Sequence, residues 1–114
     1  MESVVKKAKL LKVYVGEKER FKNKPLYQYL VQWLKEQEII GVTVFRGIEG
    51  YGSDKVLHSA RLLELSSDLP MILEIVDTEE KIDSIVPEVS KMVPKGLVYT
   101  VSVEVHKATE INRV

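Results

Sequence analysis

The chain has 114 residues, of which 45% are hydrophobic, and this is the length and composition of one folded domain over residues 1–114. Seventeen Lys and Arg balance seventeen Asp and Glu, and there is no cysteine, so the composition argues against a nucleic-acid partner, disulfides, thiolate catalysis and cysteine-ligated zinc. No apolar run approaches the ~18 residues of a membrane span, so we expect a cytoplasmic protein that does not insert into membranes.

The first half of the chain predicts a strand, a helix and a second strand. Ala8 to Gly16 alternates apolar and polar residues with the period of a half-buried strand. A helix is predicted from Pro25 to about Gln37, with apolar residues at helical spacing: Leu26, Leu30, Trp33 and Leu34. A second strand is predicted from Val42 to about Tyr51, and a polar loop follows it from Gly52 to about Ala60.

The next segment predicts a second extended arm. Its apolar residues are Leu62, Leu63, Leu65 and the run from Met71 to Val76. Pro70 cannot donate a ladder hydrogen bond, so the arm is expected at a sheet edge or a bulge.

A second helix and a last strand complete the predicted elements. Asp77 and Glu80 have the spacing of a capping box, and the apolar stripe of a helix follows at Ile82, Ile85, Val86 and Val89. Pro87 inside this helix predicts a kink. The last strand is predicted from Leu97 to Val105, where apolar residues again alternate with polar ones.

This order of elements predicts an α+β fold of the ferredoxin-like βαββαβ type, a four-stranded antiparallel sheet with two helices on one face. The last predicted strand is too apolar for an exposed sheet surface, so a second layer, most simply another subunit, should cover the other face. Charge is also uneven along the chain: residues 1–24 hold eight bases and three acids, and residues 64–89 hold eight acids and one base. Such runs are commonly solvated surfaces, but opposite poles also allow identical subunits to dock head to tail.

The densest local motif runs from Gly41 to Lys55. Glycines at 47, 50 and 52 follow the predicted second strand, where a backbone without Cβ can approach a ligand closely. Their spacing does not match a dinucleotide-binding Gly-x-Gly-x-x-Gly motif. The alternative interpretation is that they only bend a long hairpin arm.

These residues resemble the PII-like signalling proteins. Gly41-Val42-Thr43-Val44 and Gly50-Tyr51-Gly52 are similar to the strand and the turn at the base of that family's mobile loop. An uncharacterised branch of the family is resembled by four pieces of the chain: the stretch from Arg46 to Gly52, the loop containing His58, the segment from Leu65 to Pro70, and Val76-Asp77. The stretch between Thr43 and Gly50 is one residue longer than in PII proteins, and Gly47 is the natural place for a bulge that absorbs it. The family's phosphate-binding loop is reduced here to Pro94-Lys95-Gly96.

The resemblance implies a regulatory module without enzymatic activity. It implies a homotrimer that binds a small anionic metabolite or a nucleotide between subunits and presents residues 52–60 to an unidentified protein target. The expected ligand-binding residues combine cations, an imidazole, a hydroxyl and glycine amides, which bind phosphates and carboxylates: Thr43, Arg46, Gly47, Gly50, Gly52, Lys55, His58, Arg61 and Lys95. Arg46 is the strongest of these candidates because a charge in an otherwise apolar strand needs a partner, whereas His58 is also explained as an exposed loop residue.

No catalytic residue, metal ligand or resident cofactor is predicted. The residues form no recognisable Ser-His-Asp arrangement and no pair of histidines at metal-binding spacing. Two alternatives stay open. One is a trimeric metal-binding protein of the copper-tolerance type with His58 and nearby carboxylates as ligands, and the other is a small ferredoxin-like enzyme.

Overall fold

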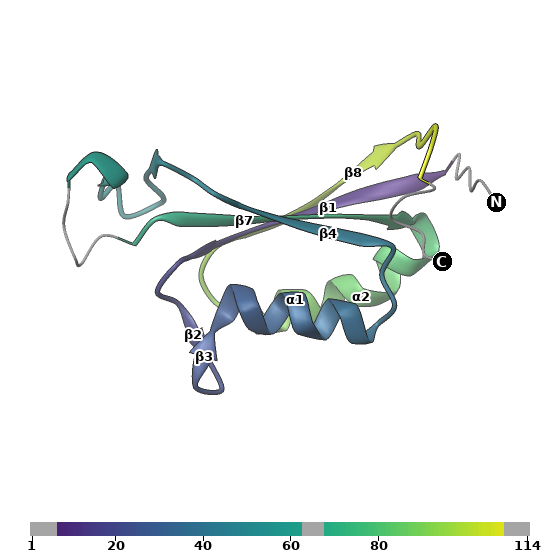
Figure 1. Ribbon diagram of the computed structural model, residues 1–114, viewed down its shortest axis with the longest axis horizontal. Helices are drawn as coiled ribbons and strands as arrows, with labels where there is room; N and C mark the ends of the chain where they lie inside the picture. The colour runs from purple at the N-terminus through teal and green to yellow at the C-terminus, as the bar shows by residue number, and fades with distance from the viewer. Residues whose placement is uncertain (1–6, 63–67, 109–114) are drawn as a thin grey trace.

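The computed structural model describes residues 7–62 and 68–108, and it confirms the predicted ferredoxin-like order of elements (Figure 1). Four strands form one antiparallel sheet in the order β4-β7-β1-β8. Their bounds are Gly41–Arg46 for β4, Pro70–Thr78 for β7, Ala8–Gly16 for β1 and Leu97–Val103 for β8. Helices α1, Leu26–Glu36, and α2, Glu79–Met92, both lie on the same face of this sheet (Figure 1).

The core lies between the sheet and the two helices. Strand β1 points Leu11, Val13 and Val15 toward the helices, and β7 does the same with the residues paired directly opposite them. The helices complete the core with their predicted apolar stripes, of which the fully buried members include Leu26, Leu30, Leu34, Ile82 and Val89. Because side chains alternate along a strand, one face of the sheet is buried and the other is left open.

A small hairpin connects β1 to α1. It consists of β2, Arg20–Phe21, and β3, Lys24–Pro25. Lys22 and Asn23 at its tip both have positive φ, 50° and 67°, which is the backbone of a tight hairpin turn. The hairpin ends at Pro25, which is the N-cap of α1 and not, as predicted, its first residue; without an N–H, Pro25 needs no acceptor at this position.

The predicted capping box of the second helix is wrong. Thr78 is the N-cap, and its side chain accepts a hydrogen bond from the Lys81 N–H at 3.1 Å. Asp77 is instead buried, and its carboxylate accepts hydrogen bonds from the N–H groups of Ile40, at 2.9 Å, and Thr78. The carboxylate thus ties the turn before β4 to the end of β7, because buried donors require partners.

The predicted strand from Val42 to Tyr51 is two strands. β4 ends at Arg46, and β5, Glu49–Gly50, pairs instead with β6, His58–Ser59. The segment from 52 to 60 is therefore not wholly a loop, since it contains β6 and begins the 3-10 helix η1, Ala60–Leu62. We call residues 47–62, which extend past the end of the sheet, the arm (Figure 1).

Pro70 does not mark an edge strand. β7 is an interior strand with β4 on one side and β1 on the other, so this prediction is wrong. Pro70 is tolerated because it is the first residue of β7, and its carbonyl accepts a hydrogen bond from the Gly47 N–H at 2.7 Å. The extended segment predicted before Pro70 is only partly described. Leu62 ends η1, and Leu63 and Leu65 lie outside the described residues.

The turn into β8 requires glycine at position 96. Gly96 has a φ of 147°, and an added Cβ would lie 2.1 Å from the Tyr14 carbonyl oxygen. Gly52, in the turn of the arm, contrasts with it because a Cβ there would meet no atom within 4 Å.

We expect Gly96→Ala to lower the free energy of unfolding by about 1–3 kcal/mol, since alanine would be strained at this φ and would collide with β1. Gly52→Ala is the matched control, and it should change stability by no more than about 0.5 kcal/mol. Urea unfolding followed by circular dichroism measures both. Equal stability of the two variants would contradict the packing of Gly96 against β1.

Candidate functional site

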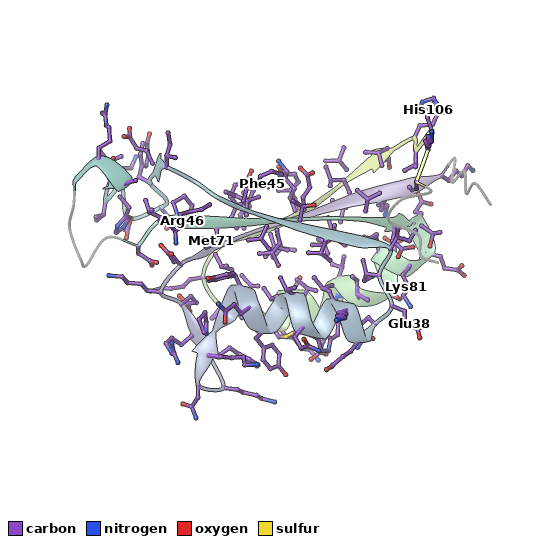
Figure 2. All side chains as sticks on the ribbon, viewed as in Figure 1. Glu38, Phe45, Arg46, Met71, Lys81 and His106 are labelled. Atoms are coloured by element: carbon purple, nitrogen blue, oxygen red, sulfur yellow. The ribbon has the colours of Figure 1, made fainter. Side chains whose placement is uncertain are left out.

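The candidate residues on β4 lie on opposite faces of the sheet. Thr43 is paired with Glu74 and belongs to the open face, as does Phe45, which Figure 2 shows on the side away from the helices. Arg46 is paired with Met71, so it shares the helix-facing side with Val42 and Val44, as a regular register predicts. Thr43 and Arg46 therefore do not form one site through β4.

Arg46 has an acidic partner that the sequence pattern did not reveal. Its guanidinium donates a hydrogen bond to Glu17 Oε2, just beyond the end of β1. The Arg46 side chain remains 58% exposed, so donors of its guanidinium stay available to an anion. Exposed ion pairs contribute roughly 0–1 kcal/mol to stability, so this pair orients Arg46 more than it stabilises the fold.

His58 belongs to a hydrogen-bonded network at the base of the arm. Its Nδ1 accepts a hydrogen bond from the Asp68 N–H at 3.1 Å, and Asp68 Oδ1 accepts one from the Lys18 N–H at 2.7 Å. The Asp68 carboxylate lies so close to Gly16 that a Cβ there would be 2.3 Å from it. His58 is thus half-buried and structural in the described chain, rather than an exposed loop residue.

The remaining arm candidates surround a compact turn. Gly50 is paired with His58, and the Lys55 N–H donates to the Gly52 carbonyl at 2.9 Å. Lys55 itself has a φ of 60° and is exposed. Gly47 touches the start of β7, where a Cβ would lie 2.6 Å from Pro70 Cγ. Of these glycines, Gly47 is required for close packing against Pro70.

Ser59 holds the two sides of the arm together. It is buried, its Oγ donates to Glu49 Oε1 at 3.1 Å, and the same Oγ accepts the Arg61 N–H at 3.2 Å. The Arg61 guanidinium also lies 3.9 Å from Glu49. Nothing in the sequence pattern distinguished Ser59, because its partner is ten residues away across a turn.

Lys95 lies at the opposite edge of the sheet. It precedes β8, whereas Arg46 ends β4, and β7 and β1 separate these two outer strands. Three strand spacings of about 4.8 Å place the outer strands about 14 Å apart. One chain therefore carries Arg46 and Lys95 at the same end of the sheet but on two different edges.

The open face carries a polar cluster that the sequence analysis did not single out. Lys12 Nζ lies 3.6 Å from a Glu74 carboxylate oxygen, and the Tyr14 and Tyr99 rings stack with centroids 6.2 Å apart. A hydrogen bond with Tyr14 is the main cause that raises the pKa of the Tyr99 hydroxyl. The charge of a Tyr14 phenolate is the main cause that raises the pKa of Lys12.

Within the described ranges 7–62 and 68–108, no three His, Cys, Asp or Glu side chains gather in a way that could hold a metal ion. None of the helices over those same ranges is long and apolar enough to cross a membrane.

Comparison with known proteins matches this chain to one conserved family. The profile of DUF190, described as "Uncharacterized ACR, COG1993", matches residues 8–105. A UPF0166 protein of Aquifex aeolicus is 45% identical over 102 residues, covering 90% of this chain and 95% of the relative. UPF0166 protein MJ1524 of Methanocaldococcus jannaschii is 36% identical over 102 residues, which cover 89% of this chain and 94% of that relative.

Solved structures share the fold. CPII from Thiomonas intermedia K12, described as a nitrogen regulatory PII-like protein bound to ADP, AMP and bicarbonate, superimposes with a TM-score of 0.67 at 15% identity. The match covers 88% of this chain and 89% of CPII. A second CPII structure, bound to ADP and bicarbonate, gives a TM-score of 0.60 at 16% identity. The predicted resemblance to PII-like proteins is confirmed at the level of the fold.

Ser59→Ala should loosen the arm without unfolding the sheet, because it removes the Oγ that bridges Glu49 and the Arg61 N–H. We expect hydrogen exchange of the Arg61 amide to accelerate about tenfold, which corresponds to the roughly 1 kcal/mol of one hydrogen bond. Ser53→Ala, at an exposed position in the same arm, is the control. Unchanged exchange at Arg61 would show that Ser59 does not hold the arm.

Proposed function

Since this chain belongs to the uncharacterised family DUF190 and has a PII-like fold, we propose that it is a trimeric regulatory module that binds a small anionic metabolite or nucleotide between subunits. In this proposal the arm, including residues 52–60, is presented to a protein target. The module is not an enzyme, and it functions in the cytoplasm.

The observation that carries the proposal is the division of the cationic candidates between two edges of the sheet. Arg46 ends one outer strand and Lys95 precedes the other, and three strand spacings separate these two strands by about 14 Å. A single anion of phosphate or carboxylate size contacts cations within hydrogen-bonding distance, near 2.7–2.9 Å. Two copies placed edge to edge would bring one Arg46 beside one Lys95, and a cyclic arrangement repeats that cleft at every subunit boundary.

The open face of the sheet supports the trimer. It exposes Phe45, Leu97, Tyr99 and Val101, an apolar surface that water solvates poorly. Sheets that face inward around a threefold axis would cover this surface, and Lys12 and Glu74 would then be paired inside the assembly.

ADP, AMP and bicarbonate are the ligands to test, because CPII is described as bound to them. The anion would use cations and backbone amides rather than a glycine-rich phosphate loop, since residues 94–96 supply a proline without an N–H and only two amides. Two amides suffice for a compact anion or for one phosphate group of a nucleotide, but not for a triphosphate enclosed on all sides by backbone amides.

The two alternatives receive less support. A metal-binding protein would need His58 and nearby carboxylates as ligands, but His58 Nδ1 already accepts the Asp68 N–H. An enzyme would need a nucleophile or an acid–base pair with mutual hydrogen bonds, whereas the Glu17 carboxylate is paired with the Arg46 guanidinium, which cannot act as an acid or a base.

Arg46→Ala should weaken binding of ADP or bicarbonate by about 1.5–3 kcal/mol, the contribution of a hydrogen bond to a charged group. Isothermal titration calorimetry measures the affinity, and sedimentation equilibrium measures the size of the assembly, which should remain three copies. Glu17→Gln should tighten binding, because it removes the carboxylate that competes with the ligand for the guanidinium.

Lys35→Ala, at an exposed position on α1, is the control and should leave affinity unchanged. An Arg46→Ala protein that dissociates or melts far below the parent would show that Arg46 is a structural ion-pair residue. Wild-type protein that is monomeric at micromolar concentration would overturn the trimer.

A further inference from the structure

The exposed large apolar side chains of the described residues fall on two surfaces. The first is the arm cluster, defined as Ile48, Tyr51, Val56 and Leu57, with exposures of 77%, 69%, 51% and 51%. The second is the open sheet face, which holds the β8 row, defined as Leu97, Tyr99 and Val101, and also Phe45 on β4. The proposed trimer turns the open face toward the threefold axis but does not specify which part of a neighbour covers the β8 row, and it leaves the arm cluster unexplained.

The arm presents these side chains on an ordered scaffold. The Ala60 N–H donates to the Ile48 carbonyl at 2.9 Å, and the Val56 N–H donates to Asp54 Oδ1 at 3.0 Å. Together with the short β5–β6 ladder, these bonds close the hairpin. The hairpin thus holds the arm cluster exposed to solvent in a fixed conformation. Binding a partner through this cluster would therefore cost little conformational entropy.

Within one chain the arm cluster and the β8 row cannot cover each other. The arm continues from β4, at one edge of the sheet, and β8 is the other edge. The arm also extends away from the sheet, past the end where β7 begins (Figure 1). The molecule is accordingly elongated, 47 Å along its longest axis against 27 Å and 23 Å.

We propose that the arm cluster of one copy packs on the β8 row of the next copy in the ring. This inference rests on the proposed trimer and specifies its contact. Opposite edges of the sheet carry the two complementary surfaces, which is the requirement for a heterologous interface that closes into a ring. Leu97 begins β8 two residues after Lys95, so the contact also brings the base of one arm, with Arg46, toward Lys95 of its neighbour.

A second copy fits the arm cluster better than an unrelated protein does. A stable interface buries about 800 Å² on each partner, and four side chains on a short hairpin are too few to provide this alone. Phe45 lies on the open face one residue before the end of β4, so it is the apolar side chain of that face nearest to the arm along the chain. An identical copy covers both surfaces at once.

Complementation between two variants tests the pairing. The arm variant is Ile48→Thr/Leu57→Thr, and the row variant is Leu97→Thr/Val101→Thr, which keeps a β-branched residue in the strand. Each variant alone should sediment as a monomer, because every interface of its ring lacks one half. An equimolar mixture should form a 1:1 dimer, since one intact arm then meets one intact row. Gln28→Ala/Glu88→Ala, on the exposed helix surface, is the control and should remain a trimer.

A disulfide trap tests the same contact without weakening it. The chain has no cysteine, so Leu57→Cys/Leu97→Cys introduces the two thiols alone. Mild oxidation should link the copies into covalent dimers and trimers on a non-reducing gel, and neither single-cysteine variant should form trimers. Absence of links in the double variant would overturn the contact.

The remaining outcomes separate this inference from the proposed function. An arm variant that keeps the size of three copies would overturn the arm contact and leave the trimer standing. If the two variants are monomeric and fail to associate on mixing, the arm contact is overturned. In that case the same apolar face of each subunit packs on its neighbours, and both variants damage it. A monomeric wild-type protein would overturn the trimer and the arm contact together.

Discussion

The antiparallel pairing of β1 with β7 is the constraint on which the rest of the structure depends. Nine residue pairs, from Ala8 with Thr78 to Gly16 with Pro70, align the apolar positions of the two central strands on one face. Both helices cover that face, so Leu11 and Leu73 are fully buried. Strand alternation then commits the other face, with Tyr14 and Glu74, to a surface that no helix among residues 7–62 and 68–108 covers.

The same pairing determines where the candidate site lies. β7 begins at Pro70 opposite Gly16. A Cβ at position 47 would collide with Pro70 and one at position 16 would collide with the Asp68 carboxylate, so glycine at both positions makes room at the start of β7. Glu17 and Asp68 meet their partners at this end of the sheet, so the ion pair of Arg46 and the hydrogen bond of His58 both follow from the start of β7. The arm is therefore anchored to the start of an interior strand of the sheet.

Two outer strands give the chain two unlike edges. β4 leads into the arm with its cations and apolar side chains, and β8 offers Lys95 and an apolar row. In the proposed ring these unlike edges meet, and the candidate anion-binding residues would then be completed between neighbours. Ligand binding and assembly are coupled in such an arrangement, because the same contact brings Arg46 to Lys95 and covers apolar surface.

The sequence by itself determined the local elements and the family resemblance. Alternation in Ala8 to Gly16 and helical spacing in Leu26 to Leu34 report burial residue by residue. The period of that burial along the chain is what distinguishes a strand from a helix. Only the tertiary structure decided that Thr78 rather than Asp77 caps α2, that β7 is an interior strand, and that Arg46 pairs with Glu17. Asp77 is held by Ile40, β7 by two neighbouring strands and Arg46 by Glu17, and all of these partners are distant in the chain. Periodicity shows that a residue is buried without showing what it contacts.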